Sequence, residues 1–344
     1  MSGGAAAMAR SRGSLRVRTP AGSPQAGRRR RGRHTSEVRE QRREWAPGRP
    51  VDAHVTLSVH RRGAGDPAYR RTPDGAVWRT ARTPEGPGTL RIGVRRSDGV
   101  VEASSWGPGA GWLLAALPAW LGEGDDPSGF EPGHPLLRDV YGRLPGWRVG
   151  RSNLDLEALV PAVLEQLVTG AEARRSWRQL LSRYGEPAPG PPSGAPAGMR
   201  VVPGPAGWAS LPSWEWHRAG VCPRRSRTIV RAALVASQLE RTLALGRADA
   251  EHSLRSLPGI GVWTAAEVMQ RAHGDPDAVS VGDFHLPGRV GWALTGRVLD
   301  DAGMLACLER WRGHRYRVTR LVEMSGLAPP RRGPRFAPRD YRAM

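Results

Sequence analysis

The stretch LPGIGVWTAA, residues 257–266, decides how this sequence folds. Pro258 fixes one backbone angle, and Gly259 and Gly261 tolerate positive φ, so two helices can meet through a turn of only a few residues. Backbone N–H groups at the start of the second helix can then bind a phosphate oxygen without any charged side chain. The stretch therefore predicts a hairpin of two helices that can contact a phosphate backbone.

Trp263 follows this turn at once. The apolar face of the second helix repeats every three to four residues, at Val262, Ala265, Ala266, Met269 and Ala272. At ~100° per residue, Trp263 falls just off this face. It is therefore available to stack on a ligand beside the phosphate site, or it packs against a neighbouring helix.

A carboxylate follows twenty residues later in SVGDFHLP, residues 280–287. A short β-like run ends there at Gly282 and Asp283, before another helical stretch. Asp283 can simply cap that helix. The same position also directs its carboxylate out of the helix start, and into a cleft if one lies there.

The charge of the chain points to nucleic acid as a partner. The net charge of the chain is +20. Residues 1–50 hold 13 arginines and three acidic residues, Glu37, Glu40 and Glu44, so this segment carries a net charge of 13 − 3 = +10, half of the total. The other half lies on the remaining chain, where it can form a positive face that attracts phosphates.

Composition disfavours disulfide-rich proteins, proteins with a metal centre and membrane proteins. Only Cys222 and Cys307 are present, so no disulfide framework and no four-cysteine metal site can be built. The chain has no lysine, so all 52 cationic side chains are arginine. We predict no metal centre, because the acidic and histidine side chains near Asp283 have no recognised ligand spacing; they are Asp275, Asp277, Asp283 and His285.

The sequence has no long apolar run and no signal peptide. We therefore expect an intracellular, cytoplasmic and nucleoid-associated protein without a membrane contact.

Composition and periodicity divide the chain into four parts. Residues 1–50 are expected to be a disordered basic tail: a solvated segment, the product of an upstream start site, a nucleic-acid-binding arm, or a segment weakly similar to a transit peptide. Residues 51–148 are expected to form a β-rich domain with short helices, beginning with the β-like run VDAHVTLSV at 51–59. Residues 149–325 have helical periodicity, and residues 326–344 are expected to be an irregular basic tail.

LPGIGVWTA followed by VSVGDFHL resembles the helix-hairpin-helix DNA glycosylases, and the WTA ending is most similar to their 3-methyladenine DNA glycosylase II branch. The resemblance runs from about residue 150 to 325, and the N-terminal β unit matches that branch in architecture only. It implies an α+β fold: a mainly α-helical, two-lobed helix-hairpin-helix glycosylase with a small N-terminal antiparallel β unit. It also implies a monomeric enzyme whose partner is double-stranded DNA with a damaged base.

The resemblance assigns roles to particular residues. Asp283 matches the catalytic carboxylate and Trp263 matches the tryptophan of the base pocket. EQLVTG at 165–170 resembles the segment that fills the gap left by a flipped base. Gln166 and Leu167 lie on this segment, and the resemblance makes Leu167 the wedge. Periodicity alone would instead place Leu167 in the core. DNA-binding positions of the hairpin are Leu257, Pro258, Gly259, Ile260, Gly261 and Thr264, where backbone carbonyls of relatives also hold a monovalent cation.

The resemblance also implies a subclass. Relatives that cut the DNA strand use a lysine in the hairpin region, where this chain has Val262 and Trp263, and others carry a four-cysteine iron–sulfur cluster. We therefore expect a monofunctional enzyme without an iron–sulfur cluster that hydrolytically excises alkylated purines of the 3-methyladenine type. The alternatives are a non-catalytic helix-hairpin-helix DNA-binding protein and a glycosylase for another damaged base. One departure from the family is Gly282, where relatives often carry a second acid.

Overall fold

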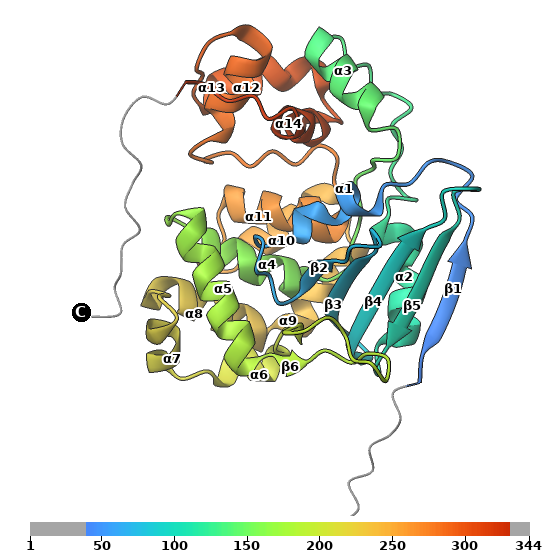
Figure 1. Ribbon diagram of the computed structural model, residues 1–344. Coiled ribbons are helices and arrows are strands. Elements are labelled where there is room, and N and C mark those ends of the chain that lie inside the picture. Colours follow the sequence, from blue (N-terminus) through green and yellow to red (C-terminus); the bar gives the residue numbers. More distant parts are fainter. Residues whose placement is uncertain (1–38, 331–344) are drawn as a thin grey trace, which may run out of the picture. The chain divides into compact units, whose positions relative to one another are not determined.

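Helices and one small antiparallel sheet make up the computed structural model, which describes residues 39–330 (Figure 1). The tails expected at either end therefore fall mostly outside the described residues, at 1–38 and 331–344. The expected α+β class is confirmed, since helices predominate and the larger sheet comes from the N-terminal part. In the described part of the chain, no helix has the length and apolar content that crossing a membrane requires.

The N-terminal part folds into a five-stranded antiparallel sheet of order β1-β5-β4-β3-β2. Its strands are β1 (Gln41–Trp45), β2 (Tyr69–Arg71), β3 (Val77–Thr83), β4 (Gly86–Val94) and β5 (Val101–Trp106). The register of the central pair places Val77 opposite Ile92 and Arg79 opposite Leu90. Helix α2 (Ala110–Trp120) packs against β4, β5 and β1 and covers one face of the sheet (Figure 1).

Two sequence predictions for this part are wrong. The expected disordered tail extended to residue 50, but Gln41–Trp45 forms strand β1, because it pairs with β5 at the edge of the sheet. The run at 51–59 was expected to be extended, but it forms helix α1 (Ala53–Leu57) and a 3₁₀ turn at Ser58–His60. Asp52 caps α1 by accepting a hydrogen bond from the backbone N–H of Val55 at 2.8 Å, and this local bond outweighs the β propensity of the run.

Helices make up most of the remaining chain. They are α3 (Pro135–Arg143), α4 (Asp155–Glu165), α5 (Gly170–Tyr184), α6 (Pro205–Ser210), α7 (Ser213–Arg218), α8 (Pro223–Leu234), α9 (Ala236–Glu240), α10 (Arg247–Arg255), α11 (Val262–Val268), α12 (Leu286–Thr295), α13 (Asp301–Leu308) and α14 (Arg315–Met324). A π-helical turn, Met269–His273, continues α11, and β6 (Glu186–Pro187) pairs with β7 (Arg200–Val201).

The apolar core consists of three main clusters. One lies between α2 and the sheet, a second joins α4, α5, α8, α10 and α11, and a third joins α3 to α12, α13 and α14. The third cluster includes Phe130, Leu137 and Trp147, so the chain before residue 149 packs partly with the C-terminal helices. Packing therefore divides the chain differently from the boundary expected near residue 149.

A buried ion pair joins the sheet to the helices. Glu157 of α4 accepts from the guanidinium of Arg79 at 2.8 Å and from the backbone N–H of Arg82 at 3.0 Å, both on β3. Burial raises the pKa of Glu157 because it disfavours the charged carboxylate. The two hydrogen bonds act in the opposite direction, since they stabilise the charged form. The sheet is thus anchored on α4, whose C-terminal end reaches the candidate site.

Candidate functional site

The predicted hairpin connects α10 to α11 through a tight turn. The backbone N–H of Ile260 donates to the carbonyl of Leu257 at 3.0 Å. Gly259 has φ +98, and a Cβ there would lie 2.2 Å from Oγ1 of Thr228, so both the conformation and the space require glycine. Gly261 has φ −95 and ψ −176, which is extended and not the positive φ that the sequence suggested. Gly261 caps α11 without a side chain, and this leaves the first N–H groups of the helix free of any side-chain cap.

The turn between α4 and α5 is hydrogen-bonded to this hairpin. Nε2 of Gln166 donates to the carbonyl of Gly259 at 3.0 Å and to Oγ1 of Thr264 at 2.8 Å. Thr264 is itself buried on α11. The predicted DNA-binding residues of the two segments therefore lie together, and Gln166 fixes their relative position.

Leu167, the predicted wedge, projects from this turn. Its side chain is 91% exposed and its backbone has φ +55. Periodicity alone placed it in the core, but α4 ends at Glu165, and the capping box of Thr169 and Glu172 begins α5. The residue therefore follows the end of the helix, where no core position remains.

Trp263 and Asp283 meet across the site. Nε1 of the indole donates to Oδ2 of Asp283 at 3.2 Å. The other oxygen, Oδ1, accepts from the backbone N–H groups of His285 and Leu286, both at 2.8 Å. Asp283 thus caps the start of α12 with one oxygen and presents the second to Trp263, so the two alternatives from the sequence are both fulfilled. Gly282 adopts φ +89, which disfavours an acidic side chain at that position.

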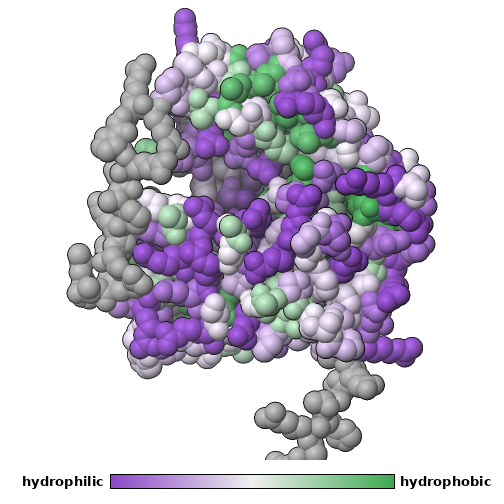
Figure 2. Space-filling model, in the orientation of Figure 1, coloured by the Kyte–Doolittle hydropathy of each residue, from purple (hydrophilic) through white to green (hydrophobic). Residues whose placement is uncertain are grey.

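These two side chains border a cavity of about 220 Å³. One wall comes from α11 and the π-helical turn, with Trp263, Glu267, Gln270 and Arg271. The opposite wall comes from α14, with Tyr316, Thr319, Arg320 and Glu323. The rest of the lining is Val59, Glu165, Ser280, Asp283 and Leu286. Figure 2 shows a hollow flanked by hydrophilic residues below helices α12–α14.

A network of hydrogen bonds holds the α11 wall in place. Glu267 pairs with the guanidinium of Arg271 at 2.8 Å and accepts from the hydroxyl of Ser280 at 2.6 Å. Nε2 of Gln270 donates to the same hydroxyl at 2.9 Å. Arg271 also donates to the backbone carbonyl of Val59 at 3.1 Å. The polar groups of this wall are therefore already oriented before any ligand enters.

Most of the polar residues that line the cavity belong to no motif of the sequence. Glu267 and Gln270 follow Trp263 at helical spacing, so the polar side of α11 could have indicated them. Tyr316, Arg320 and Glu323 belong to no motif, and only the packing of α14 places them opposite α11. Among the described residues, no group of three or more His, Cys, Asp or Glu side chains could hold a metal ion.

The sequence is similar to one group of curated proteins, although no protein-family model matches it. Over 156 residues it is 33% identical to the probable bifunctional transcriptional activator/DNA repair enzyme AlkA of Mycobacterium tuberculosis. The similar region covers 44% of this chain and 30% of that relative. The chain therefore spans less than a third of the relative's length.

The fold is similar to those of known glycosylases. The 3-methyladenine DNA-glycosylase of Archaeoglobus fulgidus superposes with a TM-score of 0.67 at 18% identity, covering 83% of this chain and 98% of that one. The apo-form of the Clostridium acetobutylicum 8-oxoguanine glycosylase/lyase superposes with a TM-score of 0.62 at 10% identity, covering 83% and 97%. At such identities the likeness establishes the fold alone. Fold and sequence therefore agree with the predicted resemblance: the chain has a fold like those of these DNA glycosylases and is similar in sequence to AlkA.

Proposed function

We propose that this protein is a monofunctional DNA glycosylase that hydrolytically releases alkylated purines of the 3-methyladenine type from duplex DNA. The observation that carries the proposal is the Asp283 carboxylate held 3.2 Å from the Trp263 indole at the wall of a cavity. The cavity of about 220 Å³ holds several times the ~30 Å³ of a water molecule but less than the ~300 Å³ of a small drug site. It is suited to one planar heterocycle.

Duplex DNA is the proposed partner, bound through the hairpin and the turn before it. The uncapped N–H groups at the start of α11 can donate to a phosphate oxygen, a contact that reads no base sequence. Rotating a nucleotide out of the stack costs a few kcal/mol, and an inserted apolar side chain such as Leu167 would fill the gap. The exposed position of Leu167 supports this role.

In the proposed reaction the protein has two tasks: to position the flipped nucleotide and to stabilise the positive charge that develops on its sugar. A purine methylated at N3 or N7 is cationic, so the bond from C1′ to the base breaks with its electron pair going to the base, which leaves neutral. The sugar then carries positive charge, which the Asp283 carboxylate stabilises. Water adds to C1′ and releases one proton. Without a lysine amine no Schiff base forms on such a side chain, so the DNA strand stays intact.

A monovalent cation at the hairpin is part of the proposal. The carbonyls of Leu257 and Gly259 each accept one hydrogen bond, from Ile260 and Gln166, and each keeps a second lone pair. The residues present are therefore compatible with a hard cation at this turn. When bound, the ion would add positive charge beside the phosphate.

The test is base release from a duplex carrying 3-methyladenine, with wild type and Asp283→Asn. Asparagine caps a helix about as well as aspartate, so the bonds to His285 and Leu286 should survive and the variant should fold. The substitution removes the charge and also replaces Oδ2, the acceptor of the Trp263 indole N–H, by an NH2 group. It is expected to slow release by roughly 10²–10⁴-fold.

Three outcomes of this experiment contradict the proposal in different ways. If the wild type releases no base but binds DNA, the chain is a non-catalytic helix-hairpin-helix protein and Asp283 is only a helix cap. If Asp283→Asn is as fast as wild type, the carboxylate is not catalytic. Strand cleavage by the purified protein would show that the enzyme is not monofunctional.

A further inference from the structure

The cavity is acidic although the chain is strongly basic. Four carboxylates and two guanidinium groups line it; they are Glu165, Glu267, Asp283, Glu323, Arg271 and Arg320. Arg62 pairs with Glu165 from outside the lining, so the local excess is one negative charge. The net charge of the whole chain is +20. In a partly enclosed site this local excess of negative charge favours a ligand that carries positive charge.

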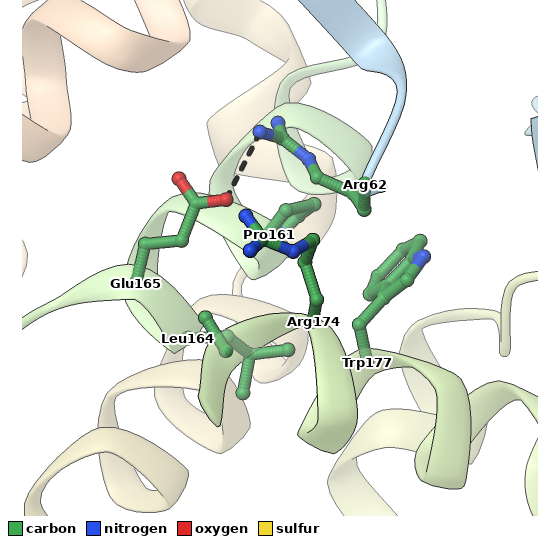
Figure 3. A pocket seen from close by; sticks show the side chains of 7 residues that line it. Arg62, Pro161, Leu164, Glu165, Arg174 and Trp177 are labelled. Atoms are coloured by element: carbon green, nitrogen blue, oxygen red, sulfur yellow. Dashed lines mark hydrogen bonds and ion pairs between the residues drawn. The ribbon is translucent and has the colours of Figure 1, made fainter. Parts of the chain in front are cut away.

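Two of these carboxylates, Glu165 and Glu323, have one oxygen without a partner among residues 39–330. Oε2 of Glu323 accepts from Arg320 at 2.8 Å, and no partner for its Oε1 is found among the described residues. Oε1 of Glu165 accepts from Arg62 at 3.2 Å, and Figure 3 shows its other oxygen directed away from Arg62. Each arginine thus fixes one oxygen of its glutamate, and both glutamates line the cavity, where the other oxygen can accept a hydrogen bond.

Tyr316 adds a hydrogen-bond donor to the wall of the cavity. The residue is only 6% exposed, it lines the cavity, and its hydroxyl has no hydrogen-bond partner in the described part of the chain. Burial raises the pKa of Tyr316, so the hydroxyl stays neutral and can donate. Such a hydroxyl at the wall of a cavity can donate a hydrogen bond to a group of a bound ligand.

We propose that Glu165 and Glu323 are specificity-determining residues that select flipped bases with positive charge and N–H donors. This inference rests on the proposed glycosylase function. A carboxylate accepts charge-assisted hydrogen bonds that are about twice as strong as neutral ones, whereas it repels a carbonyl oxygen facing it. Aromatic stacking contributes less to this selection than the carboxylates do, because the lining has two aromatic residues, Trp263 and Tyr316, and four carboxylates. The site therefore favours a cationic amino-purine such as 3-methyladenine over a neutral base with a carbonyl in place of the amine, such as hypoxanthine.

The test compares single-turnover release of 3-methyladenine and hypoxanthine from duplex DNA by wild type, Glu323→Gln and Glu165→Gln. Each variant should slow 3-methyladenine release about 10-fold or more, the worth of one hydrogen bond to a charged group, and leave hypoxanthine release unchanged or faster. The matched control is Glu309→Gln. Glu309 pairs with Arg312 at the same three-residue spacing that Glu323 has with Arg320, but outside the cavity.

The outcomes separate this inference from the proposed function. If wild type does not release 3-methyladenine, the proposed function fails. If it does, but the glutamine variants change the ratio of the two rates no more than Glu309→Gln, the inference is overturned and the function stands. Should Glu165→Gln unfold because Arg62 loses its partner, Glu323→Gln decides alone, since Arg320 keeps its hydrogen bond to Ser58 at 2.9 Å.

Discussion

The backbone of Leu167 is in the left-handed region, at φ +55, while its side chain is 91% exposed. This conformation destabilises an L-residue with a large side chain by about 1–2 kcal/mol. An exposed side chain gains no stabilisation from burial that could offset this cost. Strain without a folding benefit is typical of functional positions. The combination therefore supports a leucine retained for contact with DNA, which is the wedge role inferred from resemblance.

Replacing Leu167 should separate stability from function. Leu167→Gly relieves the strain but makes the unfolded chain more flexible, so the free energy of unfolding should stay equal or rise by up to ~1 kcal/mol. Base flipping, followed with a fluorescent base beside the lesion, should be strongly reduced. Leu167→Ala is the control that keeps the strained backbone, and its stability should change by less than ~0.5 kcal/mol. Lost stability together with unchanged flipping would instead assign Leu167 a structural role.

At the scale of elements, the hairpin depends on two glycines for different reasons. Gly259 needs both its positive φ and the space beside Thr228, so it is required by the fold itself. Gly261 is extended, and nothing lies within 4 Å of a Cβ built on it. The free space at the start of α11 is where the proposed phosphate contact would be made, so we expect glycine there to serve binding more than folding.

Alanine at each glycine tests this distinction. Gly259→Ala should destabilise the protein by more than ~1 kcal/mol and weaken DNA binding as well, because the turn must shift away from Thr228. Gly261→Ala should leave the melting temperature unchanged or slightly higher while DNA affinity falls. Thermal unfolding and fluorescence anisotropy with a short duplex measure both effects. Wild-type affinity in Gly261→Ala would mean that the phosphate does not approach this position.

At the scale of the whole molecule, buried titratable groups link stability to pH. Glu240 accepts from the backbone N–H groups of Asp155 and Leu156 at 3.0 and 3.1 Å, and so joins α9 to the start of α4. Burial raises the pKa of Glu240 to about 7. Because this folded-state pKa lies above the unfolded value, the protonated group stabilises the fold fully below about pH 4.5, and this contribution is lost as the pH rises towards 7.

Glu240→Gln should remove this part of the pH dependence. The neutral amide oxygen can still accept from the two backbone N–H groups, so the variant should gain stability relative to wild type as the pH rises from 5 to 8, by on the order of 2–3 kcal/mol. Denaturant unfolding of both proteins across this range measures the difference. The comparison cancels the opposite contribution of His54, His60 and His314, whose pKa values burial lowers. A difference that does not vary with pH would contradict the prediction.

Local sequence signals predicted the parts of this molecule that local chemistry controls. The hairpin follows from LPGIG, the start of α5 from the capping box of Thr169 and Glu172, and the sheet from short β-like runs between turns. The positions of Trp263 and Asp283 came from the spacing of two motifs that resemble a family. Strand β1 was missed because its stability comes from pairing with β5, some 60 residues later, and not from its own composition.

The sequence by itself determined a hairpin, a following tryptophan and an aspartate at a helix start, because each depends on bonds between near neighbours. Only the tertiary structure decided that Trp263 and Asp283 touch, that Leu167 is exposed, and that α14 brings Tyr316 and Glu323 opposite α11. Those contacts join segments that no periodicity relates, and they exist because apolar clusters on separate helices pack together. The acidic character of the cavity follows from that packing, since no single segment of the chain contains it.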